Sequence, residues 1–196
     1  MPDSEIARNI FLFTNAAAAV APAEAIVRPE VRLIERIQAG DAEAFAEFYK
    51  MFAPLVHGIV LARVPYDEVQ DIVQEVFLAA YKNLDTLRDT VAVGAWLARI
   101  ARNHAVGFYR QARPTEELSD EIRGRSNPNA EAGEILEAIR SLPDAYRETL
   151  VLRLIEGMTG VEIAERTGLT PESVRVNLHR GMEQLRQKLE IVGVRK

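Results

Sequence analysis

The side chains best able to carry out catalytic or metal chemistry are few and far apart in this sequence. Its 196 residues contain no cysteine, which excludes a thiol nucleophile, a disulfide scaffold, an iron–sulfur cluster and a cysteine-ligated zinc site. The three histidines, His57, His104 and His179, lack the spacing of metal ligands. No glycine-rich phosphate loop and no Ser/His/Asp arrangement is recognisable. We therefore expect no enzyme activity, no catalytic residue, no metal and no cofactor.

Arginines without neighbouring acids indicate a different chemistry, the binding of phosphate groups. The segment from Val91 to Arg113 holds four arginines and no acidic residue, a local net charge of +4. Helical spacing places six residues on one face of a helix predicted over about 94–113. They are Arg99, Arg102, Asn103, Val106, Arg110 and Arg113. This basic face suits a nucleic-acid backbone, and the alternative is a solvated helix that is rich in arginine. Trp96 is expected to anchor the core rather than to stack on bases.

The helix before it carries the opposite charge. Residues 64–89 contain six acidic and two basic residues, a net charge of −4. Apolar residues recur with helical period over a helix predicted from Asp67 to Tyr81, so one face should be buried. These residues are Val69, Ile72, Val73, Val76, Phe77 and Ala80, and the outward stripe is Gln70, Asp71, Gln74, Glu75 and Leu78. DNA would repel the outward stripe, which is either free to bind a basic protein partner or simply solvated.

Residues 160–180 have the layout of a helix-turn-helix. The residues that indicate it are Ile163 and Ala164 on the inward face of the first helix, Gly168 at the turn, Leu169 between the helices, Thr170 as N-cap and Pro171 at the first position of the second helix. The outward residues of the second helix are Ser173, Arg175, Val176, Asn177, His179 and Arg180. In this motif such positions meet base edges and phosphates in the major groove. The alternative is an antiparallel helix pair with a charged, solvated face.

The elements that must position these side chains are all predicted to be helical. Almost every segment from Val31 onward has helical period, and no alternating β-type run appears. Asp41 is a plausible N-cap, and Pro54 should start or kink a separate helix that runs from Leu55 to about Arg63.

These elements predict an all-α fold of two small helical domains joined by a flexible linker, the C-terminal one containing the helix-turn-helix. The expected organisation is a flexible N-terminal extension over residues 1–29, a first domain over 30–113, a linker over 114–133 and a second domain over 134–196. A tether of roughly 20 residues is long for a loop inside a compact domain, which favours independent modules.

The composition limits the cellular location of the chain and the kinds of partner that it can bind. No run reaches the roughly 18 apolar residues of a membrane helix, and Asn9–Ala23 makes a poor signal peptide. We expect a cytoplasmic chain without membrane insertion. The net charge of −5 argues against a DNA binder that works alone.

Together these segments resemble the sigma-70 family of bacterial transcription initiation factors, in its small two-domain extracytoplasmic-function (ECF) group. The resemblance covers about residues 31–190. Its motifs are Asp71–Phe77, similar to the family's polymerase-clamp helix, Ala95–His104, similar to its −10 element reader, Ser141–Gly157, similar to the entry to its second domain, and residues 160–180, where the family has its −35 reader.

The resemblance implies a sigma factor that binds core RNA polymerase at its clamp and flap, directs it to promoter DNA and helps to open the DNA for transcription initiation. The resemblance also explains the negative net charge of the whole chain. A sigma factor binds DNA as part of a holoenzyme, so it needs only local basic patches. The implied polymerase contacts are Gln70, Asp71, Gln74, Glu75 and Leu78; the −10 contacts are Arg99, Arg102, Asn103, Arg110 and Arg113; the −35 contacts are Ser173, Arg175, Val176, Asn177, His179 and Arg180.

The same resemblance assigns the loop from about Asp85 to Val93 to the capture of an unstacked −10 base. Two positions depart from the family pattern. Gly107 stands where many members have a polar residue, and Val176 can touch a thymine methyl group but cannot hydrogen-bond a base.

Two other functions remain open on the sequence alone. One is a stand-alone helix-turn-helix regulator, which leaves the acidic helix unexplained. The other is a sigma mimic that sequesters an anti-sigma factor, which would not need the arginine face. For the sigma factor itself we expect an anti-sigma factor partner that binds between or around the two domains and holds them in an occluded arrangement.

Overall fold

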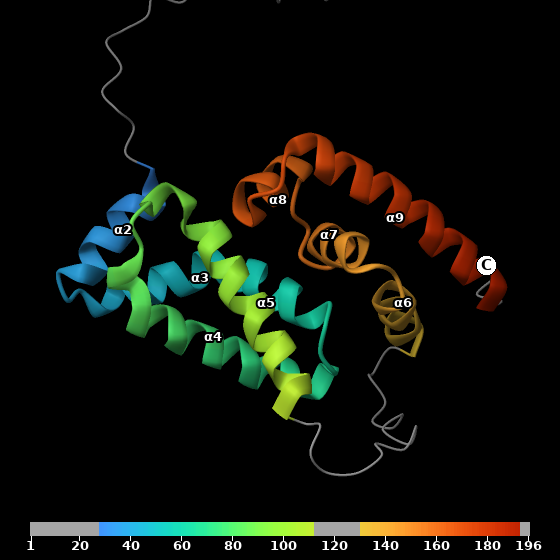
Figure 1. Cartoon of the computed structure of the whole chain (residues 1–196), viewed down its shortest axis with the longest axis horizontal. Coiled ribbons are helices and arrows are strands. Elements are labelled where there is room, and N and C mark those ends of the chain that lie inside the picture. Colours follow the sequence, from blue (N-terminus) through green and yellow to red (C-terminus); the bar gives the residue numbers. More distant parts are fainter. Residues whose placement is uncertain (1–27, 112–129, 193–196) are drawn as a thin grey trace, which may run out of the picture.

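The computed structural model describes residues 28–111 and 130–192, and within these ranges all regular structure is helical. The predicted all-α fold of two small helical domains is confirmed. We call residues 28–111 the N-terminal unit and residues 130–192 the C-terminal unit. The two units lie side by side (Figure 1). Most of the predicted extension and of the predicted linker falls outside the described residues.

The N-terminal unit is built around one long central helix. Its helices are α2 (Pro29–Gln38), α3 (Ala42–Leu61), α4 (Val69–Asn83) and α5 (Val93–Gln111), with short 3₁₀ helices η2 (Tyr66–Glu68), η3 (Leu84–Thr86) and η4 (Thr90–Ala92) between them. Helix α3 packs against α2, α4 and α5 within this unit, and nine of its residues are buried. By length and composition α3 could cross a membrane, but half of its most apolar window is buried inside the molecule.

The start of α3 is as predicted, but its middle is not. The carboxylate of Asp41 caps the helix and accepts hydrogen bonds from the backbone N–H groups of Glu43 (2.9 Å) and Ala44 (3.2 Å). The prediction that a separate helix begins at Pro54 is wrong, because α3 continues through that residue. Pro54 has no N–H group to donate to the carbonyl of Lys50, so the helix lacks that hydrogen bond. Burial of the neighbouring turns in the core outweighs that loss.

Helix α4 buries the predicted apolar stripe, and all six of its residues are less than a tenth exposed. It begins at Val69, after the short turn η2, rather than at Asp67. The stripe faces α3 and α5, which leaves the opposite, acidic side of α4 at the surface.

The C-terminal unit contains the helix-turn-helix at the predicted place. Its helices are α6 (Ala130–Arg140), α7 (Asp144–Leu154), α8 (Gly160–Thr167) and α9 (Pro171–Val192). Gly168 adopts the left-handed conformation, with φ of +77°, where α8 turns into α9. The Thr170 hydroxyl accepts a hydrogen bond from the N–H of Ser173 (3.1 Å) as the cap of α9, and Pro171 is the first residue of that helix.

The two units pack directly on each other, which differs from the expectation of independent modules. Helix α7 packs against α3, and α8 packs against α5. Five consecutive residues of α7, from Glu148 to Leu152, are buried, because α3 lies on one side of the helix and α9 on the other. We call this contact between the N-terminal and C-terminal units the seam.

Candidate nucleic-acid and partner interfaces

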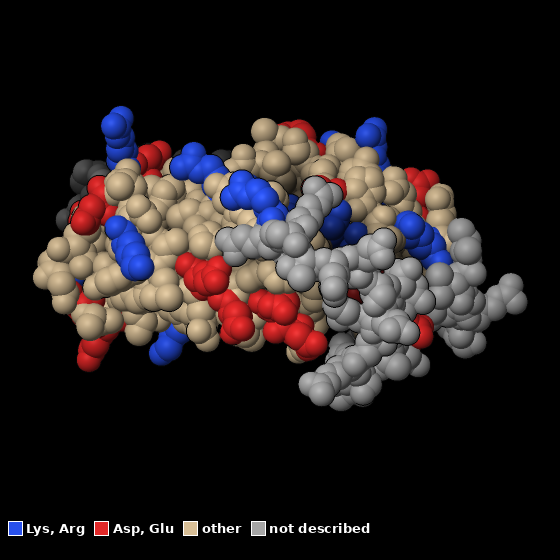
Figure 2. Space-filling model, turned by 60° about the horizontal axis from the view of Figure 1, so that its bottom comes forward, with Lys and Arg blue, Asp and Glu red and all other residues tan. Residues whose placement is uncertain are grey.

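The acidic face of α4 lies on the outer surface. All five predicted polymerase contacts, Gln70, Asp71, Gln74, Glu75 and Leu78, are exposed. Leu78 is 59% exposed, an apolar side chain at the end of a charged face. Figure 2 shows acidic side chains gathered on the face of the molecule that carries α4. This surface offers carboxylates around an apolar contact point, which suits a basic protein partner.

The arginine face of α5 is divided between surface and seam. Arg99, Asn103 and Arg110 are exposed, as a phosphate-binding role requires. Arg113 lies outside the described residues. The remaining predicted −10 residue, Arg102, is half-buried and turns toward the C-terminal unit.

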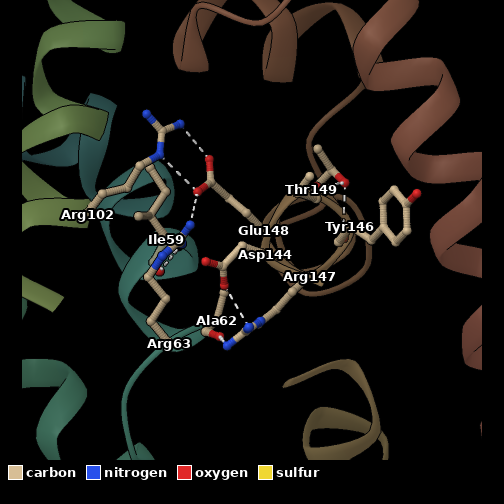
Figure 3. Close-up of polar contacts among 10 residues, drawn as sticks. Ile59, Ala62, Arg63, Arg102, Asp144, Tyr146, Arg147, Glu148 and Thr149 are labelled. Carbon is tan, nitrogen blue, oxygen red and sulfur yellow. Dashed lines mark hydrogen bonds and ion pairs between the residues drawn. The ribbon is translucent and has the colours of Figure 1, made fainter. Parts of the chain in front are cut away.

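Arg102 is held by a buried carboxylate of α7. Its guanidinium donates two hydrogen bonds to Glu148, from Nε at 3.0 Å and from Nη2 at 2.6 Å. Arg63, which follows α3, donates a third from Nη2 at 2.6 Å. The Glu148 side chain is only 6% exposed. Figure 3 shows it pointing away from α7 toward both arginines.

The electrostatics of this cluster favour full ionisation. Burial alone would raise the pKa of the Glu148 carboxyl, but the hydrogen bonds and charges of Arg102 and Arg63 outweigh burial and hold that pKa below its usual value. The hydrogen bonds to Glu148 in turn raise the pKa of Arg102. The cluster therefore consists of one carboxylate shared by two guanidinium groups.

The loop before α5 surrounds an open pocket of about 430 Å³. It is lined by Thr86, Leu87, Arg88, Asp89, Ala92, Ala95, Trp96 and Arg99. The Asp89 carboxylate accepts a hydrogen bond from the N–H of Val91 (3.0 Å) and fixes the backbone of the loop. Trp96 packs against the core as expected and also forms part of the pocket wall. Trp96 and Arg99 thus bring an aromatic side chain and a cation to the same pocket, a combination that suits a nucleotide.

Helix α9 exposes most of the predicted −35 residues. Arg175, Val176, His179 and Arg180 are exposed, and Asn177 is half-buried. Ser173 is also half-buried, and its hydroxyl accepts a hydrogen bond from Thr170 Oγ1 (2.9 Å), so it belongs to the helix cap. The first turns of α9 thus present two guanidinium groups and an imidazole together.

Sequence reasoning missed the residues that join the two units. Besides Glu148 and Arg63 these are His57, Glu156, Arg140 and Arg166. Local sequence gave no signal for Glu148, because its neighbours Arg147 and Thr149 are polar and the apolar run of α7 begins only at Leu150. Its partners are 46 and 85 residues away in the chain, and periodicity does not identify pairs at that distance.

A second missed contact lies between the acidic and basic helices. His104 Nδ1 of α5 lies 3.3 Å from Glu75 Oε2 of α4. Within the described ranges, no group of three or more His, Asp or Glu side chains could hold a metal ion. His104 is thus a surface contact between neighbouring helices.

Two family models match the chain in the order of the two units. The sigma-70 region 2 model matches residues 48–115, and the sigma-70 region 4 model matches residues 132–185. The first range contains the acidic face of α4 and the arginine face of α5, and the second contains the helix-turn-helix.

Relatives and solved structures agree with these matches. The chain is 32% identical to the ECF RNA polymerase sigma-E factor of Escherichia coli K12 over 81% of this chain and 93% of that protein. It is 28% identical to the ECF RNA polymerase sigma factor SigW of Bacillus subtilis, over 80% and 94% of the two chains. Its fold is similar to that of CnrH in complex with the cytosolic domain of CnrY, with a TM-score of 0.62, 25% identity and coverage of 83% of this chain and 97% of that one.

A second structural match supports the fold alone. It is the sigma factor RpoE from Bartonella quintana, solved in complex with the anti-sigma factor NepR, with a TM-score of 0.55, 18% identity and coverage of 79% and 100%. On the combined matches, the chain belongs to the ECF group of sigma-70 RNA polymerase sigma factors, whose role is promoter recognition and transcription initiation.

Proposed function

We propose that α4 docks this chain on the clamp of core RNA polymerase, while α5 contacts the −10 element and α9 contacts the −35 element of a promoter. The observation that carries the proposal is the separation of charge between neighbouring helices. The exposed side of α4 carries Asp71 and Glu75, whereas α5 exposes Arg99 and Arg110. DNA repels the first surface and attracts the second, so the two surfaces suit different partners.

The pocket before α5 supports a more specific role in opening DNA. A base that leaves the duplex loses stacking energy of a few kcal/mol, and a binding pocket must return a comparable amount. Trp96 offers a stacking surface and Arg99 a cation at the rim of the pocket. We assign this pocket to one unstacked base of the −10 element.

An anti-sigma factor and a cytoplasmic location complete the proposal. Two structurally similar chains were solved in complexes with another protein. CnrH was bound to the cytosolic domain of CnrY, and the Bartonella RpoE was bound to the anti-sigma factor NepR. The C-terminal unit would also contact the polymerase flap, as the sigma-70 region 4 match suggests. A regulator that works without polymerase leaves the exposed carboxylates and Leu78 of α4 without a role.

The clamp assignment predicts the effect of reversing charge on α4. Asp71→Arg combined with Glu75→Arg should reduce binding to core polymerase at least tenfold, because two attractive charges become repulsive. The measurement is the dissociation constant with core polymerase by fluorescence anisotropy or biolayer interferometry. Wild-type affinity in the double variant would contradict the assignment.

The matched control for this variant is Glu35→Arg combined with Glu43→Arg. It changes the net charge by the same amount at exposed positions of α2 and α3. Its affinity for polymerase should stay within about twofold of the wild type, because dissolved salt screens surface charges that lie far from the contact. A loss equal to that of the α4 variant would show a general charge effect instead.

A further inference from the structure

Helix α2 lies beside the pocket that precedes α5. The wall of this pocket includes Thr86 of η3 and Ala92 of η4, and α2 packs against both of these short helices. Figure 1 shows α2 next to the segment that leads into α5. Helix α2 has ten residues and is only about 15 Å long. The part of the chain that precedes Arg28, the N-cap of α2, is therefore attached close to the pocket.

The pocket combines an aromatic wall with positive charge. Trp96 is half-buried and forms part of the wall, whereas Arg88 and Arg99 are exposed at the rim. Among the described lining residues only Asp89 is acidic, and its carboxylate accepts a hydrogen bond from the backbone N–H of Val91 (3.0 Å). A ligand that suits this pocket therefore carries an aromatic group together with negative charge.

The sequence before Arg28 has the same two properties. Residues 1–27 contain three acidic side chains and one basic side chain, a net side-chain charge of −2. The charged residues are Asp3, Glu5, Arg8 and Glu24. Residues 10–13 are four consecutive apolar residues, of which Phe11 and Phe13 are aromatic. Such a run is more stable when it is removed from water.

We propose that residues 10–13 fill the pocket before α5 in the free chain, with a phenylalanine ring against Trp96 and the negative charge of residues 1–27 near Arg88 and Arg99. The inference rests on the proposed function of the pocket, because the segment takes the place of the unstacked −10 base. Residues 10–13 thereby lower the affinity of the free chain for single-stranded DNA, and DNA must displace them in order to bind.

The length of chain between this segment and α2 permits the contact. Residues 14–27, fourteen in number, separate Phe13 from Arg28, and when fully extended they span about 50 Å. Helix α5, with 19 residues, is about 28 Å long. Residues 10–13 can therefore reach the pocket from the start of α2.

The attachment to the chain makes even a weak contact effective. A ligand on a short tether acts at an effective concentration in the millimolar range. A segment that binds with a dissociation constant of about 0.1 mM would then occupy the pocket in about ten chains for each chain with an empty pocket. The apparent affinity for a competing DNA base would fall about tenfold.

Trp96 is the only tryptophan in the chain, so tryptophan fluorescence reports on the pocket wall alone. Phe11→Ser combined with Phe13→Ser removes both rings and keeps the length and charge of the chain. In the full-length protein this double variant should shift the emission of Trp96 to the red and raise its quenching by acrylamide about twofold, because water and quencher reach the indole. Emission and quenching equal to those of the wild type would overturn the proposal.

The matched control removes two apolar side chains from the same part of the chain. Val20→Ser combined with Ile26→Ser leaves residues 10–13 intact and also keeps the length and charge. The fluorescence of this control should equal that of the wild type. A change as large as that of the Phe11→Ser, Phe13→Ser variant would contradict a specific role for residues 10–13.

A peptide tests the contact in a second way. A synthetic peptide with the sequence of residues 1–20, added to the full-length Phe11→Ser, Phe13→Ser variant, should restore the wild-type emission with a dissociation constant of about 0.1 mM. The same peptide with serine in place of Phe11 and Phe13 should have no effect. A wild-type peptide that leaves the emission unchanged at millimolar concentration would reject the contact. Wild-type emission that changes on dilution would also reject it, since the segment would then bind a second copy of the chain.

DNA binding separates this inference from the proposed function. Single-stranded DNA of random sequence is a suitable probe, because stacking on an aromatic side chain tolerates any base. It should bind the Phe11→Ser, Phe13→Ser variant about tenfold more tightly than the wild type. Equal, measurable affinities would overturn the inhibition. If DNA binds neither chain while the peptide binds the variant, the base-binding role of the pocket fails and the contact with residues 10–13 stands.

Discussion

At the scale of single residues, the side chains of Arg63 and Arg102 meet at the carboxylate of Glu148. The helices packed around α7 shield this carboxylate from water. A buried carboxylate without partners would be strongly unfavourable, and here two guanidinium groups supply the compensation. Replacing Glu148 by glutamine leaves both arginines without their anion. We expect a loss of about 1–3 kcal/mol in the free energy of unfolding at neutral pH.

The pKa of Glu148 predicts how this stabilisation depends on pH. Its pKa is lowered in the folded chain, so the stabilisation is fully present above the ordinary carboxyl pKa of about 4.3 and is lost as the pH falls through the lowered value. The difference in Tm between wild type and Glu148→Gln should therefore shrink steadily below pH of about 4. Calorimetry from neutral to acidic pH measures it, and a constant difference would show that the carboxylate charge contributes nothing.

The arginines of α9 lead to a second prediction at this scale. Arg175→Ala with Arg180→Ala should weaken binding to a −35 element, since each specific contact contributes about 1–3 kcal/mol. Arg186→Ala, at an exposed position two turns further along α9, is the control and should have a small effect. Run-off transcription from a −35-dependent promoter measures the loss, and unchanged transcription by the double variant would rule out this face.

Residue-level prediction from the sequence succeeded where local spacing decides the outcome. The capping roles of Asp41 and Thr170 follow from residue type and position alone, and the structure confirms them. The burial of Arg102 could not be foreseen. Its spacing placed it correctly on the basic face of α5, but its partner Glu148 is set by packing between distant segments.

At the scale of elements, periodicity predicted the faces of helices better than their ends. The apolar stripe of α4 is buried as a whole, and its acidic side is exposed. The break expected at Pro54 is absent, because tertiary burial of α3 overrides a local helix-breaking preference. A single sequence records the local preference but not the burial that opposes it.

The turn of the helix-turn-helix gives a prediction at this scale. Gly168→Ala should destabilise the chain by about 1–2 kcal/mol, because a side chain disfavours its left-handed backbone. Its Cβ would also lie 3.1 Å from that of Ala95. Gly107→Ala, within α5 and in open space, should instead stabilise by up to about 1 kcal/mol through helix propensity. Thermal unfolding measures both, and equal shifts in Tm would contradict this account of the turn.

At the scale of the whole molecule, the two units are joined by a seam of buried apolar and charged side chains that composition and periodicity could not predict. The arrangement of the units depends on Gly58, Gly94 and the charges around Glu148, which come from distant parts of the sequence. In this arrangement the acidic face of α4 and the first turns of α9 remain exposed, while Arg102 is held in the seam. In this arrangement one predicted −10 residue is engaged by the C-terminal unit, whereas Arg99, Asn103 and Arg110 stay exposed.

The central claim is that this chain brings RNA polymerase to promoters through two DNA-contacting helices and one polymerase-contacting helix. The most direct measurement is run-off transcription with purified bacterial core polymerase and this chain on a library of promoter fragments, with the start sites mapped. The account predicts transcripts that depend on the chain and start at a fixed distance from shared −10 and −35 sequences. Transcription that is the same with and without the chain, together with no binding to core polymerase, would contradict it.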